Sequence, residues 1–370
     1  MAGALAHGAF PYDQVPPGQV WSQACSPTSG DTLPAWPGLG LEKQAFITPL
    51  TRIVSVGSCF AHAIAHYLQS EGYHYLVTEP GPPWLSAEQL RAFQYGLYSA
   101  RYGHIYTTLQ LQQLIFRAWE QFSPADDCWP GSDETQWLDP FRPRIQPGGF
   151  VSPEAMRADR QSHLAAVKSA FSSADLMIVT LGLSECWRSR LDGAVYPVCP
   201  GRGLGQFDPK AYYFENLALP QIEEGLRACI AFLAQVNPTL RWILTLSPVP
   251  LAVTAEKKHV LEATGYSKAV LRVAIENICR EFPQVDYFPA YEWVMYDRAQ
   301  AFETNGRQVR AETVQAIMRR FEAGFVLEHP QQTPGSKKES PKEAEFTIQP
   351  CDEEALLSLL EDDFLTERPG

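Results

Sequence analysis

The chain has 370 residues, of which 45% are hydrophobic, and it carries a formal net charge of −12 at pH 7. This length predicts a large buried core in one or two α/β domains, and the acidic balance argues against a nucleic-acid or anionic-membrane partner. The sequence contains no run of about 18 apolar residues, so we expect no membrane span.

Residues 1–45 are rich in proline and glycine, with Trp21 and Trp36 as isolated aromatic side chains. This composition predicts an extended arm. Residues 46–326 are predicted to form the α/β domain. The N-terminus has neither a basic segment nor a long apolar core, so a secretory signal is not expected. The eight cysteines show no Cys-x-x-Cys spacing, which favours free thiols in a reducing, cytoplasmic environment and no bound metal.

Residues 51–72 predict a buried strand followed at once by a helix. Ile53–Val56 is a short, mostly β-branched run, and the apolar residues after it repeat at helical spacing: Phe60, Ile64, Tyr67 and Leu68. Gly57 permits a sharp turn and places Ser58 on the hinge, facing the positive end of the helix dipole, where an oxyanion is stabilised. The alternative is that Ser58 only caps the helix.

The rest of the domain alternates apolar strands with amphipathic helices. Further strands are predicted at 73–78, 175–181, 240–246 and 285–288. Helices are predicted at 86–94 (opened by a capping box), 108–121, 153–174, 220–236, 267–282 and 311–325. This order predicts a three-layer α/β/α sandwich around a mostly parallel five-stranded sheet. Ligands bind beyond the carboxyl ends of such strands, and the polar motifs described below follow strands.

Two segments fall outside this alternation. Residues 122–152, with the sequence Asp139-Pro140-Phe141-Arg142-Pro143, predict an irregular insertion over the top of the sheet. Residues 327–370 lack apolar periodicity and predict a disordered acidic tail. Its leucines between 356 and 360 lie among acids, so the tail is either solvated disorder or contains a short helix that docks on a protein partner or on its own domain.

A family resemblance rests on five consecutive residues, Gly57-Ser58-Cys59-Phe60-Ala61, and on ordered blocks further along the chain. The chain resembles the GSCFA family from about Tyr12 to Phe325, and this family is grouped with the SGNH (GDSL-like) esterases and acyltransferases. The resemblance implies a flavodoxin-like fold, no cofactor, and Ser58 as a nucleophile whose own amide donates to the oxyanion. Cys59 is a rival nucleophile in the first helical turn, although we expect its thiol to pack against the sheet.

Two further blocks supply candidate oxyanion and substrate groups. SGNH enzymes carry Gly-x-Asn after the strand at 175–181, so the resemblance implies a backbone donor at Gly182. Glu185 holds the polar position but cannot donate unless it is protonated, so it either orients a base or sugar hydroxyl or simply binds nearby amides. In the block 102–107, His104 stands where the family more often has Asn and donates only in one tautomer. Tyr106 is expected to bind substrate or to pack in the core, and Ser247 follows the strand at 240–246.

The general base is the weak point of the resemblance. SGNH enzymes place Asp-x-x-His before the final helix, and the matching frame here is Asn305-Gly306-Arg307-Gln308. The nearest substitute is His259 on the loop after the fourth strand, with an ordinary surface histidine as the alternative. Lys268 and Arg272, one helical turn apart, either bind a carboxylate or phosphate or are solvated charges. His62 and His66 have a spacing that can bind metal, but packing is the preferred reading.

Three hypotheses follow from these residues. The leading one is a serine esterase or O-acyltransferase that acts on an acylated carbohydrate or a small-molecule ester, with Ser58 as nucleophile and His259 as base. The second is a binding or scaffold protein that has lost catalysis with the Asp-x-x-His block. The third is an enzyme that uses Cys59.

Overall fold

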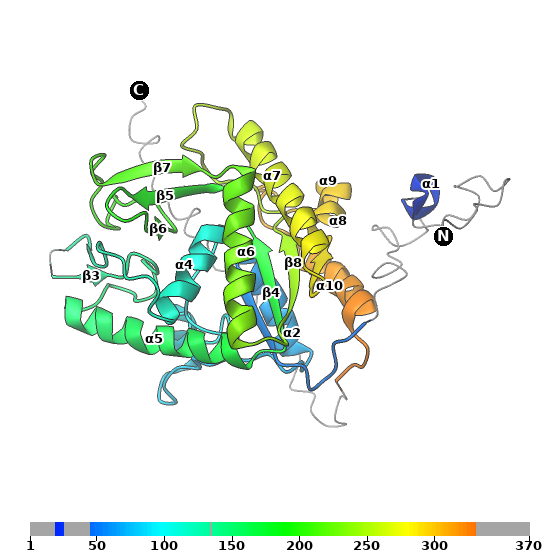
Figure 1. The fold of residues 1–370 in the computed structure, drawn as a ribbon, viewed down its shortest axis with the longest axis horizontal. Coiled ribbons are helices and arrows are strands. Elements are labelled where there is room, and N and C mark those ends of the chain that lie inside the picture. The colour runs from blue at the N-terminus through cyan, green and yellow to red at the C-terminus, as the bar shows by residue number, and fades with distance from the viewer. Residues whose placement is uncertain (1–18, 26–44, 134, 331–370) are drawn as a thin grey trace, which may run out of the picture.

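The computed structural model describes residues 19–25, 45–133 and 135–330 (Figure 1). Most of the predicted arm at 1–45 lies outside the described residues, and so does the tail from residue 331 with its leucines. Within the arm, α1 (Trp21–Ala24) places Trp21 against Tyr296 with ring centroids 6.4 Å apart. The carbonyl oxygen of Cys25 also accepts a hydrogen bond from the Tyr296 hydroxyl at 2.6 Å.

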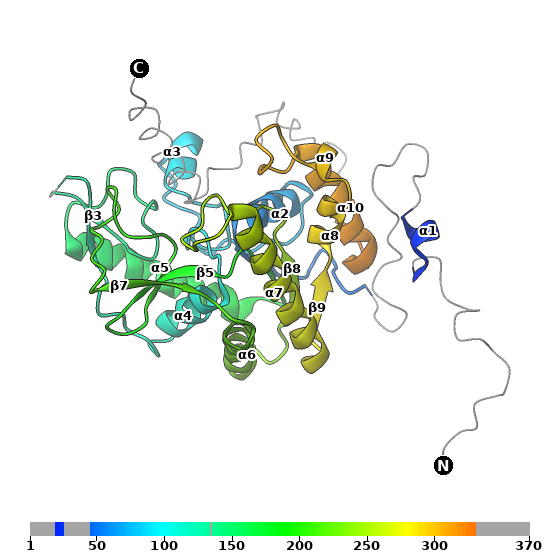
Figure 2. The same ribbon diagram turned by 90° about the horizontal axis from the view of Figure 1, so that it is seen from above.

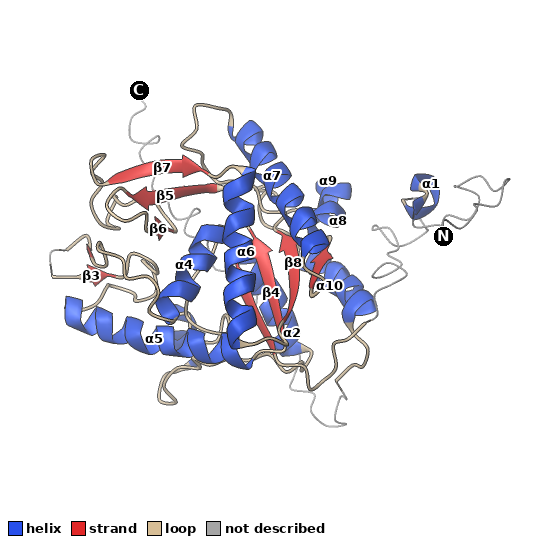
Figure 3. Cartoon of the chain, in the orientation of Figure 1, coloured by secondary structure: helices blue, strands red, loops and turns tan. Residues whose placement is uncertain are grey.

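The central sheet has four parallel strands in the order β1-β4-β8-β9 (Figure 3). Their bounds are Ile53–Gly57, Leu176–Leu181, Arg241–Leu246 and Val285–Phe288. The strands are mostly buried, as expected when helices cover both faces of a parallel sheet. The predicted α/β class with its parallel sheet is therefore confirmed.

The strand predicted at 73–78 is reduced to a single bridge, in which Tyr75 pairs with Ile53 at the edge of β1. The chain then leaves the sheet, because the amide of Thr78 donates to the carbonyl oxygen of Ser99 at 2.8 Å. The sheet consequently has four strands where five were expected.

Two helical layers enclose the sheet, and Figure 2 shows α2 and α10 on one side of it with α6 on the other. The first layer packs in one apolar cluster with Ile53, Ile178 and Ile243: α2 (Cys59–Ser70), α8 (Ala290–Tyr296) and α10 (Ala311–Phe325). The second layer packs in another cluster with the alternate residues of the strands: α4 (Thr108–Ala118), α5 (Pro153–Ser173), α6 (Leu219–Val236) and α7 (Val260–Glu281).

Several boundaries differ from the sequence-based expectation. The capping box that opens α3 (Ala87–Ala92) is present, with Ser86 and Gln89 bonded reciprocally. Helix α7 begins at Val260, seven residues before the predicted start, because His259 caps it. Helices α8 and α9 (Arg298–Ala301) were not predicted.

A second, antiparallel sheet occupies residues 185–216, where the sequence predicted no strand. It has the order β6-β5-β7, with bounds Val195–Tyr196, Glu185–Ser189 and Tyr212–Asn216. The insertion contributes the short pair β2 (Trp129–Pro130) and β3 (Trp137–Leu138). Aromatic side chains from both segments share a small core that contains Trp129, Phe141 and Tyr196.

No helix in the described ranges is long and apolar enough to cross a membrane.

Candidate active site

The turn from β1 into α2 depends on Gly57. Its φ is +147°, and a Cβ at this position would lie 2.8 Å from the Cβ of Thr180 on β4. Only glycine fits such a close backbone approach without strain. The turn brings Ser58 to the N-cap position of α2 at the carboxyl end of β1, as the sequence predicts.

The Ser58 hydroxyl is buried and unpaired. The residue is 3% exposed, and its Oγ has no hydrogen-bond partner among the described residues. Although Ser58 occupies the N-cap position, its side chain makes no capping bond, so the alternative that it serves only as a cap is wrong. A buried hydroxyl without a partner costs free energy, and such groups in native structures commonly have a functional reason.

A cluster of tyrosine and histidine rings begins at the backbone of Ser58. The Tyr98 hydroxyl donates to the carbonyl oxygen of Ser58 at 3.2 Å, and the Tyr98 ring contacts both His62 (5.9 Å between centroids) and His104 (6.1 Å). His104 in turn stacks on Tyr106 at 5.7 Å. Burial, together with electrostatic repulsion from His104 and His66, lowers the pKa of His62 to about 4. His62 is therefore a neutral imidazole at physiological pH.

Gly182 lies against Ser58, as expected, but its amide is occupied. A Cβ on Gly182 would be 3.2 Å from the Ser58 Cβ, which places the end of β4 beside the serine. The Gly182 amide donates to the carbonyl oxygen of Tyr106 at 3.0 Å. The expected backbone donor is thus committed to the loop that carries His104. Tyr106 itself is 3% exposed, so its ring packs in the interior rather than forming an open platform.

Glu185 binds the loop between β8 and α7. One carboxylate oxygen accepts from the Thr254 hydroxyl at 2.6 Å and the other from the amide of Ala255 at 3.4 Å. Burial raises the pKa of this carboxyl group. The arrangement matches the expectation of a strand-end carboxylate that binds nearby groups. Ser247, at the end of β8, accepts from the amide of Val249 at 3.3 Å.

His259 is exposed and caps α7. Its Nδ1 accepts a hydrogen bond from the amide of Leu261 at 3.2 Å. A backbone amide can only donate, so the neutral ring carries its proton on Nε2 and has no second lone pair for the Ser58 proton. This geometry gives His259 a structural role that competes with the one expected from the sequence.

The two cations predicted to bind an anion together face different surroundings. Lys268 is 3% exposed and donates to the carbonyl oxygen of Gly182 at 2.6 Å. Arg272 donates instead to Glu292 at 2.9 Å and to Glu276 at 3.0 Å. Cys59 is buried at the start of α2, in agreement with the packing role expected for it.

The Asn305–Gln308 frame forms a turn before α10. The Asn305 side-chain oxygen accepts from the amides of Arg307 (3.0 Å) and Gln308 (2.9 Å). Arg307 reaches the carbonyl oxygen of Pro250 at 3.3 Å, so this turn does approach the loop after β8.

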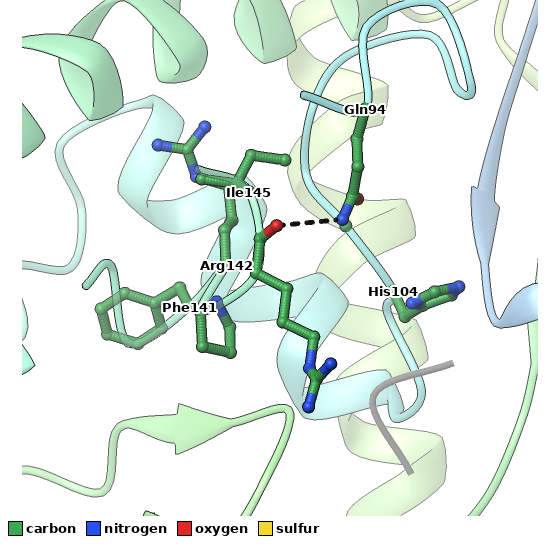
Figure 4. Close-up of a pocket in the computed structure, with 8 residues that line it drawn as sticks. Gln94, His104, Phe141, Arg142 and Ile145 are labelled. Atoms are coloured by element: carbon green, nitrogen blue, oxygen red, sulfur yellow. Dashed lines mark hydrogen bonds between the residues drawn. The ribbon is translucent and has the colours of Figure 1, made fainter. Parts of the chain in front are cut away.

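A small open cleft, with room for about one water molecule, lies next to His104 (Figure 4). His104 lies across it from Phe141 and Arg142, and the Gln94 side chain donates to the carbonyl oxygen of Arg144 at 3.3 Å. Sequence reasoning placed 139–143 over the sheet but did not predict this cleft. Its lining is Gln94, Gly103, His104, Phe141, Arg142, Pro143, Arg144 and Ile145.

The sequence model of the GSCFA family matches residues 52–321, which include Ser58, the Gly182 turn and most of α10. The chain belongs to the GSCFA family. Comparison with curated proteins gives no match. Among solved structures, a family 3 carbohydrate esterase from Clostridium thermocellum is similar, with 10% identity, a TM-score of 0.31, and coverage of 74% of this chain and 93% of the other.

A second similar structure is a carbohydrate esterase family 2 enzyme with a carbohydrate-binding domain, from Corynascus thermopiles (Myceliophthora fergusii). It has 12% identity and a TM-score of 0.26, with coverage of 75% of this chain and 69% of that chain. At these TM-scores neither similarity bears on the function of this GSCFA-family protein.

A buried ionic network supports the cleft in this GSCFA-family protein. Arg142, in the cleft wall, donates to Asp139 at 2.9 Å and to Asp159 at 2.8 Å. Arg101, three residues before His104, donates to Asp159 at 3.0 Å, and Arg160 donates to Asp139 at 2.9 Å. Although burial would raise it, Arg142 and Arg160 hold the pKa of Asp139 well below its ordinary value. The network therefore joins the His104 loop to the insertion and to α5.

No metal centre accompanies this site within the described part of the chain, where no group of three His, Cys, Asp or Glu side chains is placed to hold an ion. The residues that sequence reasoning undervalued are His62 and Tyr98. The signal available for His62 was its position one helical turn after Ser58. Nothing local marks Tyr98, because its contact with Ser58 spans 40 residues of chain.

Proposed function

We propose that this GSCFA-family protein is a serine esterase or O-acyltransferase that acts on an acylated carbohydrate or another small-molecule ester. Ser58 is the nucleophile. The observation that carries the proposal is the buried Ser58 hydroxyl, which neither caps its helix nor bonds to any described group. Family membership supports the same assignment.

His104 is the base that fits this proposal best. It contacts the ring of Tyr98, whose hydroxyl bonds to the Ser58 carbonyl oxygen, and it lines the cleft that we assign to the ester. In the proposed reaction, Ser58 Oγ attacks the acyl carbonyl while His104 accepts its proton. The same histidine then protonates the leaving alkoxide. Water or an acceptor hydroxyl afterwards resolves the acyl-serine and regenerates the free hydroxyl.

The oxyanion of this reaction is stabilised by the amides that begin α2. The positive end of the helix dipole lies there, and the Ser58 side chain makes no capping bond to these amides. The Gly182 amide takes no part, because Tyr106 already accepts its hydrogen bond.

Access to Ser58 requires a local opening, since its Oγ is buried in the described conformation. We assign this movement to the loop 98–106, which lies on Ser58 through the Tyr98 hydroxyl and on Gly57 through the amide of Ile105 at 3.0 Å. Substrate binding at the cleft displaces this loop and brings His104 into position. A cytoplasmic location belongs to the same proposal.

The direct test is covalent labelling with a fluorophosphonate probe, followed by mass spectrometry of the modified peptide. We expect labelling of the wild-type protein at Ser58 and none of Ser58→Ala, with turnover of acetylated sugars lost in parallel. Labelling that persists in Ser58→Ala, or that maps to Cys59, would refute Ser58 as nucleophile. Iodoacetamide inactivation that Cys59→Ala abolishes would instead support the thiol.

A second function, a binding protein without catalysis, is favoured by one observation: the described conformation closes Ser58 off while Asn305 and Gln308 replace the usual acid and base. This alternative predicts an unlabelled wild-type protein that still binds acylated oligosaccharides in calorimetry. It also predicts equal affinity for Ser58→Ala.

A further inference from the structure

The backbone amides and carbonyl groups of the turn that ends β4 form hydrogen bonds to several other parts of the chain. The amides of Gly182 and Leu183 both donate to the Tyr106 carbonyl oxygen, at 3.0 and 3.3 Å. The amide of Ser184 donates to the Ser267 hydroxyl at 2.8 Å, and its carbonyl oxygen accepts from the amide of Leu217 at 2.8 Å. A turn with this many partners is held in a single conformation.

Lys268 completes the set by donating to the Gly182 carbonyl oxygen at 2.6 Å. The side chain is 3% exposed, and Ser267 beside it is fully buried. An ammonium group buried this deeply must be satisfied by protein groups, and the Gly182 carbonyl oxygen is one of them. The bond fixes the Gly182 turn to α7, and this position has a reason beyond packing.

The reason lies in what the turn touches. A Cβ on Gly182 would meet the Ser58 Cβ at 3.2 Å and the Tyr106 ring at 3.4 Å, so a shift of a few tenths of an ångström changes the space beside the serine. The bond to Lys268 also fixes the direction of the Gly182 carbonyl group, and a carbonyl dipole turned toward the serine would repel a developing oxyanion.

We propose that Lys268 is a positioning residue, which with Ser267 holds the Gly182 turn against Ser58 and keeps the Gly182 carbonyl away from the oxyanion. This inference rests on the proposed function of Ser58. It replaces the anion-binding role that the spacing of Lys268 and Arg272 indicated.

The test is the rate of labelling by a fluorophosphonate probe in wild type, Lys268→Met and Lys268→Arg, with Lys257→Met as a control at an exposed position. We expect Lys268→Met to lower the maximal inactivation rate by about 100-fold with little change in probe affinity, as small misplacements of reacting groups do. Lys268→Arg should recover part of the loss, and Lys257→Met should match wild type. The pH midpoint of labelling should not move, because Lys268 does not exchange the proton.

Measurements below the unfolding transition of each variant separate positioning from stability. If Lys268→Met does not fold, Ser267→Ala, which removes only the acceptor for the Ser184 amide, is expected to lower the same rate. If folded Lys268→Met or Ser267→Ala is labelled as fast as the wild-type protein, the positioning role is refuted, while Ser58 remains the nucleophile. An unlabelled wild-type protein would refute the proposed function itself, and this role with it.

Discussion

Gly57 and Thr180 face each other across β1 and β4 at the last pair of that ladder, with room between them for hydrogen only. The pairing fixes the separation of the two backbones, so neither strand can yield to a larger side chain. The chain therefore turns sharply at this point and presents Ser58 at the end of the sheet. The position of the serine follows from this contact.

Gly57→Ala should destabilise the protein by about 3 kcal/mol or more, since it combines a positive φ with overpacking against β4. Urea unfolding measures the change. The matched control is Gly265→Ala within α7, where a Cβ would meet nothing within 4 Å and should stabilise by about 0.5–1 kcal/mol. Equal unfolding midpoints for the two variants would contradict the close approach.

Ser58→Ala should abolish labelling without loss of stability. The hydroxyl makes no bond, so its removal should leave the free energy of unfolding unchanged or raise it by up to about 1 kcal/mol. Thr245→Val on β8 is the control, because Thr245 Oγ1 is also buried without a partner among the described residues. It should show the same stability and full labelling. A large destabilisation of Ser58→Ala would mean that its hydroxyl has a structural bond.

Three histidine variants separate the candidate bases. His104→Ala should lower turnover by about 10²–10⁴-fold, the usual effect of losing a general base. His259→Ala should keep its activity and lose about 0.5–2 kcal/mol of stability with the cap of α7. His62→Ala tests the neighbouring imidazole. Full activity in His104→Ala together with a large loss in His259→Ala would restore the sequence-based assignment.

The free energy of unfolding should decrease as the pH falls from about 6.5 to 5. Burial lowers the pKa of His163 and of His62 to about 4, below the ordinary value of 6.5. In this window the unfolded chain binds protons that the folded protein excludes, so each histidine contributes a slope of up to about 1.4 kcal/mol per pH unit. Denaturant unfolding at each pH measures the slope.

His163→Gln should remove one such contribution while its amide still donates to Glu79, the present partner of His163 at 2.9 Å. The slope should become shallower by up to about 1.4 kcal/mol per pH unit. An unchanged slope would show that His163 is protonated in the folded protein.

The sequence predicts what depends on local pattern. The change from β-branched residues to helical spacing at Gly57 locates the hinge, and the apolar runs locate the four strands of the sheet. The segment after 185 was missed because its aromatic residues pair across strands, as Trp187 does with Tyr196 and Phe214, and such pairing has no short-range signature.

The site was harder to predict for the same reason. An imidazole near Ser58 was expected, but the contact of Tyr98 with Ser58, and of His104 with Tyr98, depends on how a loop 40 residues away returns to the sheet. His259 shows that sequence position alone can mislead. Its place after β8 favoured a general base, whereas its hydrogen bond from the amide of Leu261 makes it the cap of α7.

The arginine and aspartate framework behind the cleft has a consequence for how this protein responds to acidity. Guanidinium groups stay charged at any physiological pH, and the pKa of Asp139 lies well below its ordinary value, while that of Glu79 falls to about 2 because its bonds to His163 and its attraction to Arg142 outweigh burial. The charges of this framework therefore stay the same in mild acid. A loss of turnover between neutrality and pH 5, in protein that is still folded, would arise from groups outside the framework.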